Sequence, residues 1–151
     1  MRQLFLLLIL TTFMTTASAQ YSMIVSGQGK NGTYRLKVST TVKDVKSGKE
    51  VLKRYAVHGV LFKGFAYEEE GIARQKPLVN DPNIESEKAS FFNAFFSEKK
   101  HEQYVTIVNT SYTSIKVKGG YEVSGLILVD KEKLLNYLEE SGVVKGLSNL
   151  W

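Results

Sequence analysis

The sequence predicts an α+β fold in two layers, with a mixed, mostly antiparallel sheet of about four strands and helices packed on one face. Three observations support this class. Residues 33–43 alternate between apolar and polar side chains, as expected for a strand with one buried face. Apolar side chains between Leu52 and Val60 recur at spacings of three and four, which is typical of an amphipathic helix. The pair Gly119-Gly120 separates two further alternating segments and indicates a hairpin.

The first 19 residues have the features of a cleavable export signal. Arg2 supplies a positive start, residues 4–14 form an apolar run, and Ala17-Ser18-Ala19 has the small side chains of a cleavage site. The run is too short to span a bilayer, and no later segment is long and apolar enough to try. We therefore expect a periplasmic or secreted protein without a transmembrane segment, whose residues 20–151 form a single α+β domain.

The elements after the signal are expected in the following order. A polar, glycine-containing lead-in, in which residues 23–25 could form a short strand, precedes the strand at 33–43. A helix is expected over residues 49–63, where Ala56 and Gly59 would allow a close approach to the sheet. Residues 65–84 contain both prolines and show no clear period, which predicts a long loop.

The second half of the chain predicts a helix, three strands and a last helix. Residues 85–98 form the first of these helices, and its four phenylalanines are expected to be core: Phe91, Phe92, Phe95 and Phe96. Strands are expected at residues 103–110, 114–118 and 121–129. Asp130 should then cap a helix from residue 131 to about 141, which Gly142 ends.

Composition limits the chemistry that the chain can carry. The sequence has no cysteine, which excludes disulfides, thiolate metal sites and a lipid anchor on an N-terminal cysteine. The net charge of +5 at pH 7 makes the protein mildly basic. For an exported protein, such a charge favours contact with anionic lipid headgroups or acidic glycans over nucleic acid.

Charged side chains supply the predicted partner-binding residues. On the expected sheet, five basic side chains could share the open face: Arg35, Lys37, Lys43, Lys116 and Lys118. The long loop adds the acidic triplet Glu68, Glu69 and Glu70. Together these eight residues form the surface through which the protein would bind a partner.

No segment has the signature of a catalytic, cofactor or metal site. The two histidines lack a partner at helical ligand spacing, so we expect no metal, with His58 a packed or capped structural residue and His101 exposed to solvent. The chain also lacks a nucleophile elbow and a glycine-rich phosphate loop. Paired carboxylates for glycoside hydrolysis could come from Glu68, Glu69, Glu70, Asp81, Glu85 and Glu87.

Four segments stand out for their sequence: YAVHGVLFKGF at residues 55–65, KPL at 76–78, DPNIESEKASFFNAFF at 81–96 and YEVSGLILVDKEKLLNYLEESGVVKGL at 121–147. Together they resemble a group of uncharacterised exported proteins of Bacteroides-type bacteria. The late YxVxGxxxVD strand that enters a helix also looks like the N-terminal domain of flagellar assembly protein T and related small envelope lipoproteins. This resemblance implies envelope-associated assembly or scaffolding without chemistry. Gln20 stands where the lipoprotein members have their lipidated cysteine.

The sequence therefore predicts a non-catalytic, exported interaction or scaffolding module that needs no cofactor. Its expected partner is another envelope protein, bound through the long loop and the free face of the sheet. One alternative is that the basic sheet face binds an acidic glycan or a lipid headgroup. Another is a glycan-active hydrolase that uses the loop carboxylates.

Overall fold

The computed structural model describes residues 20–28, 32–67 and 74–145, which fold as α+β with a mixed sheet of six strands and four α-helices. The α+β class and the mixed sheet are thus confirmed. The predicted export signal at 1–19 and the acidic triplet at 68–70 lie outside the described residues.

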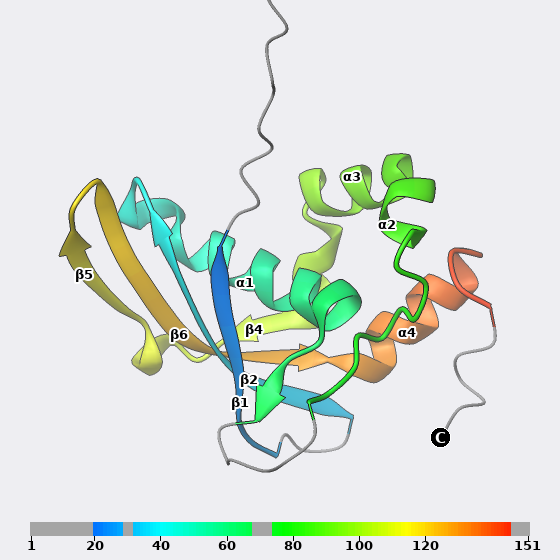
Figure 1. The fold of residues 1–151 in the computed structure, drawn as a ribbon, viewed down its shortest axis with the longest axis horizontal. Helices are drawn as coiled ribbons and strands as arrows, with labels where there is room; N and C mark the ends of the chain where they lie inside the picture. Colours follow the sequence, from blue (N-terminus) through cyan, green and yellow to red (C-terminus); the bar gives the residue numbers. More distant parts are fainter. Residues whose placement is uncertain (1–19, 29–31, 68–73, 146–151) are drawn as a thin grey trace, which may run out of the picture.

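The sheet has the strand order β3-β1-β2-β6, and the outer edge of β6 pairs with both β4 and β5 (Figure 1). The strands are β1 (Tyr21–Gln28), β2 (Thr33–Val42), β3 (Ala66–Tyr67), β4 (Val105–Ile107), β5 (Thr113–Val117) and β6 (Gly120–Asp130). β1 and β3 pair in parallel, and the other pairings of these six strands are antiparallel. The strands beyond the predicted four are β3 and β1, and β1 is longer than the expected residues 23–25.

The alternation in β2 and β6 divides the sheet into a buried and an open face. Leu36 of β2 and Ile127 of β6 are partners across the ladder, and both are fully buried. Met23 and Val25 of β1 lie on the same face of the sheet and are also buried. Among the described strand residues, none whose side chain points to the other face is buried. The sheet therefore has its core on one face only, as the period of two predicts.

Helix α1 (Gly48–His58) covers the buried face and contacts β2, β4 and β6. Leu52 and Ala56 have no exposed surface. The helix continues into a π-helical turn, Gly59–Lys63, so the predicted element at 49–63 is helical throughout but widens near its end. Gly59 lies against Met23 of β1, and a side chain there would overlap Met23. This confirms the close approach that the sequence predicts.

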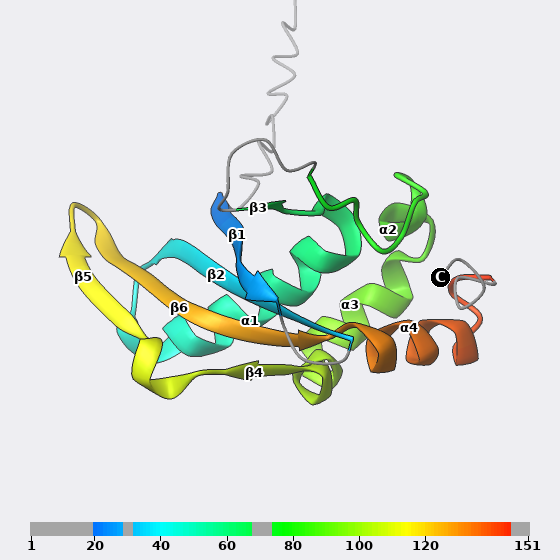
Figure 2. The ribbon, with the colours of Figure 1, turned by 90° about the horizontal axis from the view of Figure 1, so that it is seen from below.

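The predicted helix at 85–98 is two helices, α2 (Ile84–Glu87) and α3 (Ala89–Ser97). They meet at Lys88, whose φ of -109° and ψ of 30° interrupt the helical backbone. Helix α4 (Lys131–Glu140) begins as expected, because the Asp130 carboxylate accepts a 3.0 Å hydrogen bond from the Lys133 N–H. In Figures 1 and 2, α2, α3 and α4 gather at one end of the molecule, and the β5–β6 hairpin extends at the other.

The segment predicted as a long loop is anchored, in its described part, to the π-helical turn that follows α1. Phe65 and Gln75 form an isolated antiparallel bridge, in which the distances between backbone nitrogen and oxygen are 3.1 and 2.9 Å. Leu78 and Val79 are buried, and their N–H groups donate to the carbonyls of Val60 and Leu61. Two adjacent apolar residues after a proline show neither helical nor strand periodicity. This explains why the sequence pattern does not reveal their packing.

The predicted strand at 103–110 is wrong over most of its length. Residues Lys100–Tyr104 form a 3₁₀ helix, and only Val105–Ile107 pair as β4. A short 3₁₀ turn, Asn109–Ser111, then interrupts the sheet edge before β5 begins. The Ser111 hydroxyl oxygen fills this gap by accepting a 2.8 Å hydrogen bond from the Leu126 N–H of β6.

Candidate functional site

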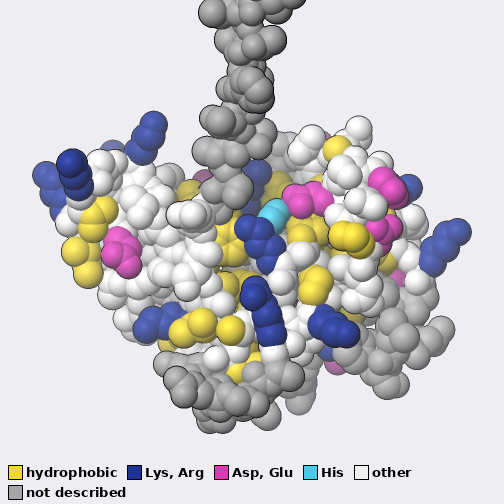
Figure 3. Space-filling view, viewed as in Figure 1, with side chains coloured by type: hydrophobic (Ala, Val, Ile, Leu, Met, Phe, Trp, Pro, Cys, Tyr) yellow, Lys and Arg dark blue, Asp and Glu magenta, His cyan; other side chains and the backbone are white. Residues whose placement is uncertain are grey.

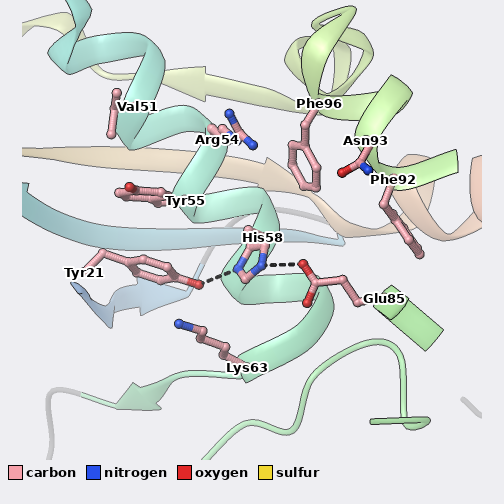
Figure 4. Close-up of a pocket in the computed structure, with 10 residues that line it drawn as sticks. All are labelled: Tyr21, Val51, Arg54, Tyr55, His58, Lys63, Glu85, Phe92, Asn93 and Phe96. Carbon is pink, nitrogen blue, oxygen red and sulfur yellow. Dashed lines mark hydrogen bonds and ion pairs between the residues drawn. The ribbon is translucent and has the colours of Figure 1, made fainter. Parts of the chain in front are cut away.

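A pocket of about 590 Å³ lies between α1 and α3, and β1 and α2 contribute to one end. Figure 4 shows the ten residues that line it: Tyr21, Val51, Arg54, Tyr55, His58, Lys63, Glu85, Phe92, Asn93 and Phe96. On the corresponding face of the molecule, basic, acidic, hydrophobic and histidine side chains lie together near the centre (Figure 3).

Two helices supply the long walls of the pocket. Val51, Arg54 and His58 recur at spacings of three and four, so they share one stripe of α1. This stripe lies beside the one that Leu52 and Ala56 bury against the sheet. Phe92 and Phe96 are four residues apart and lie on one face of α3. The pocket thus lies where this face of α3 meets the stripe of α1 that contains Arg54.

A hydrogen-bonded relay crosses the pocket from β1 to α2. The Tyr21 hydroxyl lies 2.9 Å from His58 Nδ1, and His58 Nε2 lies 2.9 Å from Glu85 Oε1 (Figure 4). An ionised carboxylate only accepts hydrogen bonds, so His58 Nε2 carries the proton and donates it to Glu85. Nδ1 of the neutral ring is then an acceptor, and the Tyr21 hydroxyl donates to it.

Aromatic rings and two cations surround this relay. Tyr21 stacks on Tyr55, with ring centroids 4.6 Å apart. Lys63 Nζ lies 4.5 Å from the Tyr21 ring centroid, and the Arg54 guanidinium lies 5.4 Å from that of Phe96. Within the described part of the chain, neither cation lies within ion-pair distance of a carboxylate. Each of these cations is held against an aromatic ring at the pocket.

Burial shifts the pKa of both members of the relay that face the protein interior. It raises the pKa of the Tyr21 phenol, and the neighbouring Glu85 charge raises it further. Burial also lowers the pKa of His58. The hydrogen bond and charge of Glu85 oppose this decrease, whereas Lys63 and Arg54 add to it. At neutral pH the site therefore holds a protonated phenol and a neutral imidazole.

The lowered pKa of His58 predicts a loss of stability on acidification. Unfolded histidine binds a proton near pH 6.5, above the pKa of folded His58, so the unfolded state holds more protons in that window. The free energy of unfolding should therefore decrease as the pH falls from 7 through the window below 6.5. Urea denaturation at several pH values measures this slope.

His58→Gln keeps a donor and an acceptor but does not titrate, so its slope should be shallower than that of the wild type. His101→Gln is the variant for comparison: burial lowers the pKa of His101 as well, so its slope should also be shallower than that of the wild type. An identical slope in the wild type and His58→Gln would contradict the assignment.

The structure separates the basic residues predicted to share the open sheet face. Arg35 and Lys37 lie on that face and are exposed. Lys116 pairs with Tyr121, which lies on the same face of β6 as the buried Val123. The predicted placement of Lys116 on the open face is therefore wrong. Lys43 follows the end of β2, and Lys118 lies in the turn between β5 and β6. The register of the short strand β5, which the alternation alone does not fix, accounts for the difference.

The structure brings only some of the other predicted site residues to the pocket. Of the carboxylates considered for hydrolysis, Glu85 lines the pocket, whereas Asp81 and Glu87 are not among its lining residues. His58 is packed and hydrogen-bonded, as expected. The expectation for His101 is wrong: the residue is 4% exposed, because the 3₁₀ helix turns it towards Phe95 and Phe96.

Sequence reasoning missed Tyr21, Arg54 and Lys63 as site residues. Tyr21 stands in a segment interpreted as a lead-in, and it reaches His58 only through the pairing of β1 with β2. Arg54 could have been found from the sequence, because it precedes His58 by one helical turn on the predicted helix. Lys63 had no comparable signal, since the π-helical turn places it.

Comparisons with protein-family models, curated proteins and solved structures found no match to this chain. The resemblance to exported envelope proteins therefore stays a prediction. Within residues 20–28, 32–67 and 74–145, no helix is both long and apolar enough to cross a membrane. The same residues contain no group of three or more His, Asp or Glu side chains arranged to hold a metal ion.

Proposed function

We propose that the protein is an exported, non-catalytic binding module of the bacterial envelope, and that its ligand is an acidic saccharide held in the pocket between α1 and α3. The observation that carries this proposal is the position of Arg54 and Lys63, two cations without a carboxylate partner among the described residues, beside aromatic walls. This is the acidic-glycan alternative, moved from the sheet face to the pocket.

The charge of the pocket favours an anion. Its described lining contains Arg54 and Lys63 as cations and Glu85 as the single carboxylate, with His58 neutral at pH 7. Glu85 already accepts a hydrogen bond from the His58 N–H, which stabilises its carboxylate within the protein. The planar guanidinium of Arg54 matches the geometry of a carboxylate, which it can bind through two parallel hydrogen bonds.

The walls favour a sugar ring over a purely apolar ligand. Tyr55 and Phe96 line the pocket, with Tyr21 stacked on Tyr55 and Phe96 only 7% exposed, and the Asn93 side chain is exposed and carries both a donor and an acceptor. Most small-molecule sites combine aromatic walls with a few polar groups that fix the orientation of the ligand. A pyranose acid has a ring to stack, hydroxyls for the polar groups and one negative charge for the cations.

Titration with monouronates tests the proposal. We expect galacturonate or glucuronate to bind, and the neutral sugars galactose and glucose to bind much more weakly. Removing a charged hydrogen-bond donor costs about 1.5–3 kcal/mol, so Arg54→Gln should raise Kd by roughly 10- to 100-fold. Isothermal titration calorimetry measures both effects.

The sheet offers a matched control. Arg35→Gln and Lys37→Gln remove the same charges from the open face and should leave Kd within about twofold, because these residues lie outside the pocket. Binding should also weaken as salt rises from 0.1 to 1 M, where the screening length decreases from about 10 to about 3 Å. An equal effect of the pocket and sheet variants would refute the assignment of the site.

A partner protein on the open sheet face is a second candidate. The observation that favours it is the absence of buried residues on that face within the described strands, together with Ile115, whose side chain is 63% exposed. Photocrosslinking from residue 115 in the native host tests this candidate, with residue 93 in the pocket as the comparison position.

A further inference from the structure

The Tyr21 hydroxyl has one hydrogen to donate, and in the structure His58 takes it. The oxygen lies 2.9 Å from His58 Nδ1, and His58 Nε2 donates its own hydrogen to Glu85. Tyr21 also lines the pocket (Figure 4). The free side of its oxygen therefore offers a ligand lone pairs and no hydrogen.

The two cations of the pocket would bring an anion close to this hydrogen bond. Lys63 Nζ lies 4.5 Å from the centroid of the Tyr21 ring. Arg54 precedes His58 by one helical turn on α1, so the two side chains are neighbours on the helix surface. A carboxylate held by Arg54 and Lys63 would thus lie beside Tyr21 and His58.

A carboxylate in that position conflicts with the present direction of the Tyr21 hydrogen bond. Its oxygens only accept hydrogen bonds, so they would face the lone pairs of the Tyr21 oxygen. The conflict ends when Tyr21 turns its hydrogen towards the ligand. His58 Nδ1 must then carry a hydrogen and donate it to Tyr21, because otherwise two acceptors would face each other at 2.9 Å.

A change of tautomer cannot supply that hydrogen. If the single hydrogen of His58 moved from Nε2 to Nδ1, Nε2 would face Glu85 Oε1 at 2.9 Å as a second acceptor. The ring satisfies both neighbours only when both of its nitrogens carry hydrogen, which makes it a cation. This third positive charge would in turn favour the bound carboxylate.

The groups around His58 determine how readily it accepts the proton. Burial, which has the largest effect, lowers the pKa of His58; the hydrogen bond and charge of Glu85 raise it, and Lys63 and Arg54 lower it. A carboxylate bound to these two cations would offset their effect and raise the pKa of His58. The titratable or charged groups that face His58 come from β1, α1, the π-helical turn and α2: Tyr21, Arg54, Tyr55, Lys63 and Glu85.

Resting on the proposed function, we infer that the carboxylate of the bound uronate accepts a hydrogen bond from Tyr21, and that His58 takes up one proton from the solvent as the ligand binds. Tyr21 and His58 are thus binding residues in addition to Arg54 and Lys63. Carboxyl groups titrate near pH 4, so the uronate itself keeps its charge down to about pH 5.5.

Proton uptake requires that affinity increase on acidification. Between the pKa values of His58 in the free protein and in the complex, the complex holds more protons, so Kd decreases as the pH falls through this window. The steepest possible change is about tenfold per pH unit, for uptake of one full proton. We expect the Kd of galacturonate to decrease by at least about threefold between pH 8 and pH 5.5.

Calorimetric titration in buffers of different ionisation enthalpy counts the protons taken up. We expect net uptake with galacturonate at pH 6 in the wild type, and neither uptake nor pH dependence of Kd in His58→Gln. His101→Gln is the matched control, because His101 is 4% exposed and is not among the lining residues, so it should behave as the wild type. Tyr21→Phe keeps the ring that stacks on Tyr55 and should raise Kd about tenfold.

The outcomes separate this inference from the proposed function. Binding of galacturonate to the wild type without proton uptake would overturn the inference and leave the proposed function standing, and this measurement needs no variant. Equal uptake in His58→Gln would assign the proton to another group, and an unchanged Kd in Tyr21→Phe would remove the proposed donor; either result overturns the inference. The absence of binding between pH 5.5 and pH 8 would overturn both proposals together.

Discussion

Replacing Phe95 by alanine is expected to lower the free energy of unfolding by about 3–5 kcal/mol, because a large buried ring is lost and a cavity remains. Phe95 is 1% exposed. Its ring contacts join α3 to α4 and to the 3₁₀ helix between α3 and β4, so the cavity would open where three elements meet. The contacting rings are Phe91, Phe96, His101, Tyr104 and Tyr137.

Phe91→Ala on the same helix is the matched control for Phe95→Ala. Phe91 is only half-buried, so the same change of side chain should cost clearly less. Urea denaturation of both variants gives the comparison. Equal and small losses would show that the phenylalanines of α3 form a surface and not a core.

Gly64→Ala is expected to destabilise the protein by about 3 kcal/mol or more. Gly64 has φ of 66° and ψ of -174°, a conformation that is essentially restricted to glycine and costs other residues about 1–3 kcal/mol. A Cβ at this position would also overlap the backbone carbonyl of Gln75, which is hydrogen-bonded to the Phe65 N–H. Relief of this overlap would break the bridge between Phe65 and Gln75.

Gly142→Ala separates the two contributions. Gly142 has the same φ of 66°, but a Cβ there would meet no atom within 4 Å. This variant should therefore cost only the conformational penalty, about 1–2 kcal/mol. Thermal and urea unfolding of both variants measure the difference. If Gly64→Ala cost no more than Gly142→Ala, the close contact with Gln75 would be unimportant for stability.

The sequence predicted those elements whose periodicity is long and uninterrupted. β2 ends one residue before the end of the predicted strand at residues 33–43, and α4 has the expected cap at Asp130 and a positive φ at Gly142. β6 differs from its prediction by one residue at each end. In these elements local pattern and tertiary burial agree, so either one suffices to find them.

The elements that were missed depend on contacts between distant residues. β3 has two residues and exists because the chain after Gly64 returns to β1. The break at Lys88 carries no glycine or proline, and a helical period continues through it. Tertiary packing decides both features, and no window of local sequence contains that information.

The candidate site was predictable only in part for the same reason. His58 and Glu85 were recognised as titratable residues, but they are 27 positions apart in the chain and meet only when α2 returns to α1. Tyr21 reaches His58 across 37 positions. Arg54 could be placed from helix geometry alone. Sequence reasoning can thus find members of such a site, whereas their assembly follows from topology.

The interruption between β4 and β5 affects how this protein can associate with itself. An unbroken edge strand offers a row of free N–H and C=O groups on which another chain can add a strand, which is a route to aggregation. Here the edge beside β6 consists of three paired residues, a 3₁₀ turn and five paired residues. An incoming strand could align with no more than five residues before it met the turn. The Ser111 hydrogen bond that completes the ladder of β6 thereby also limits the growth of the sheet into a fibre.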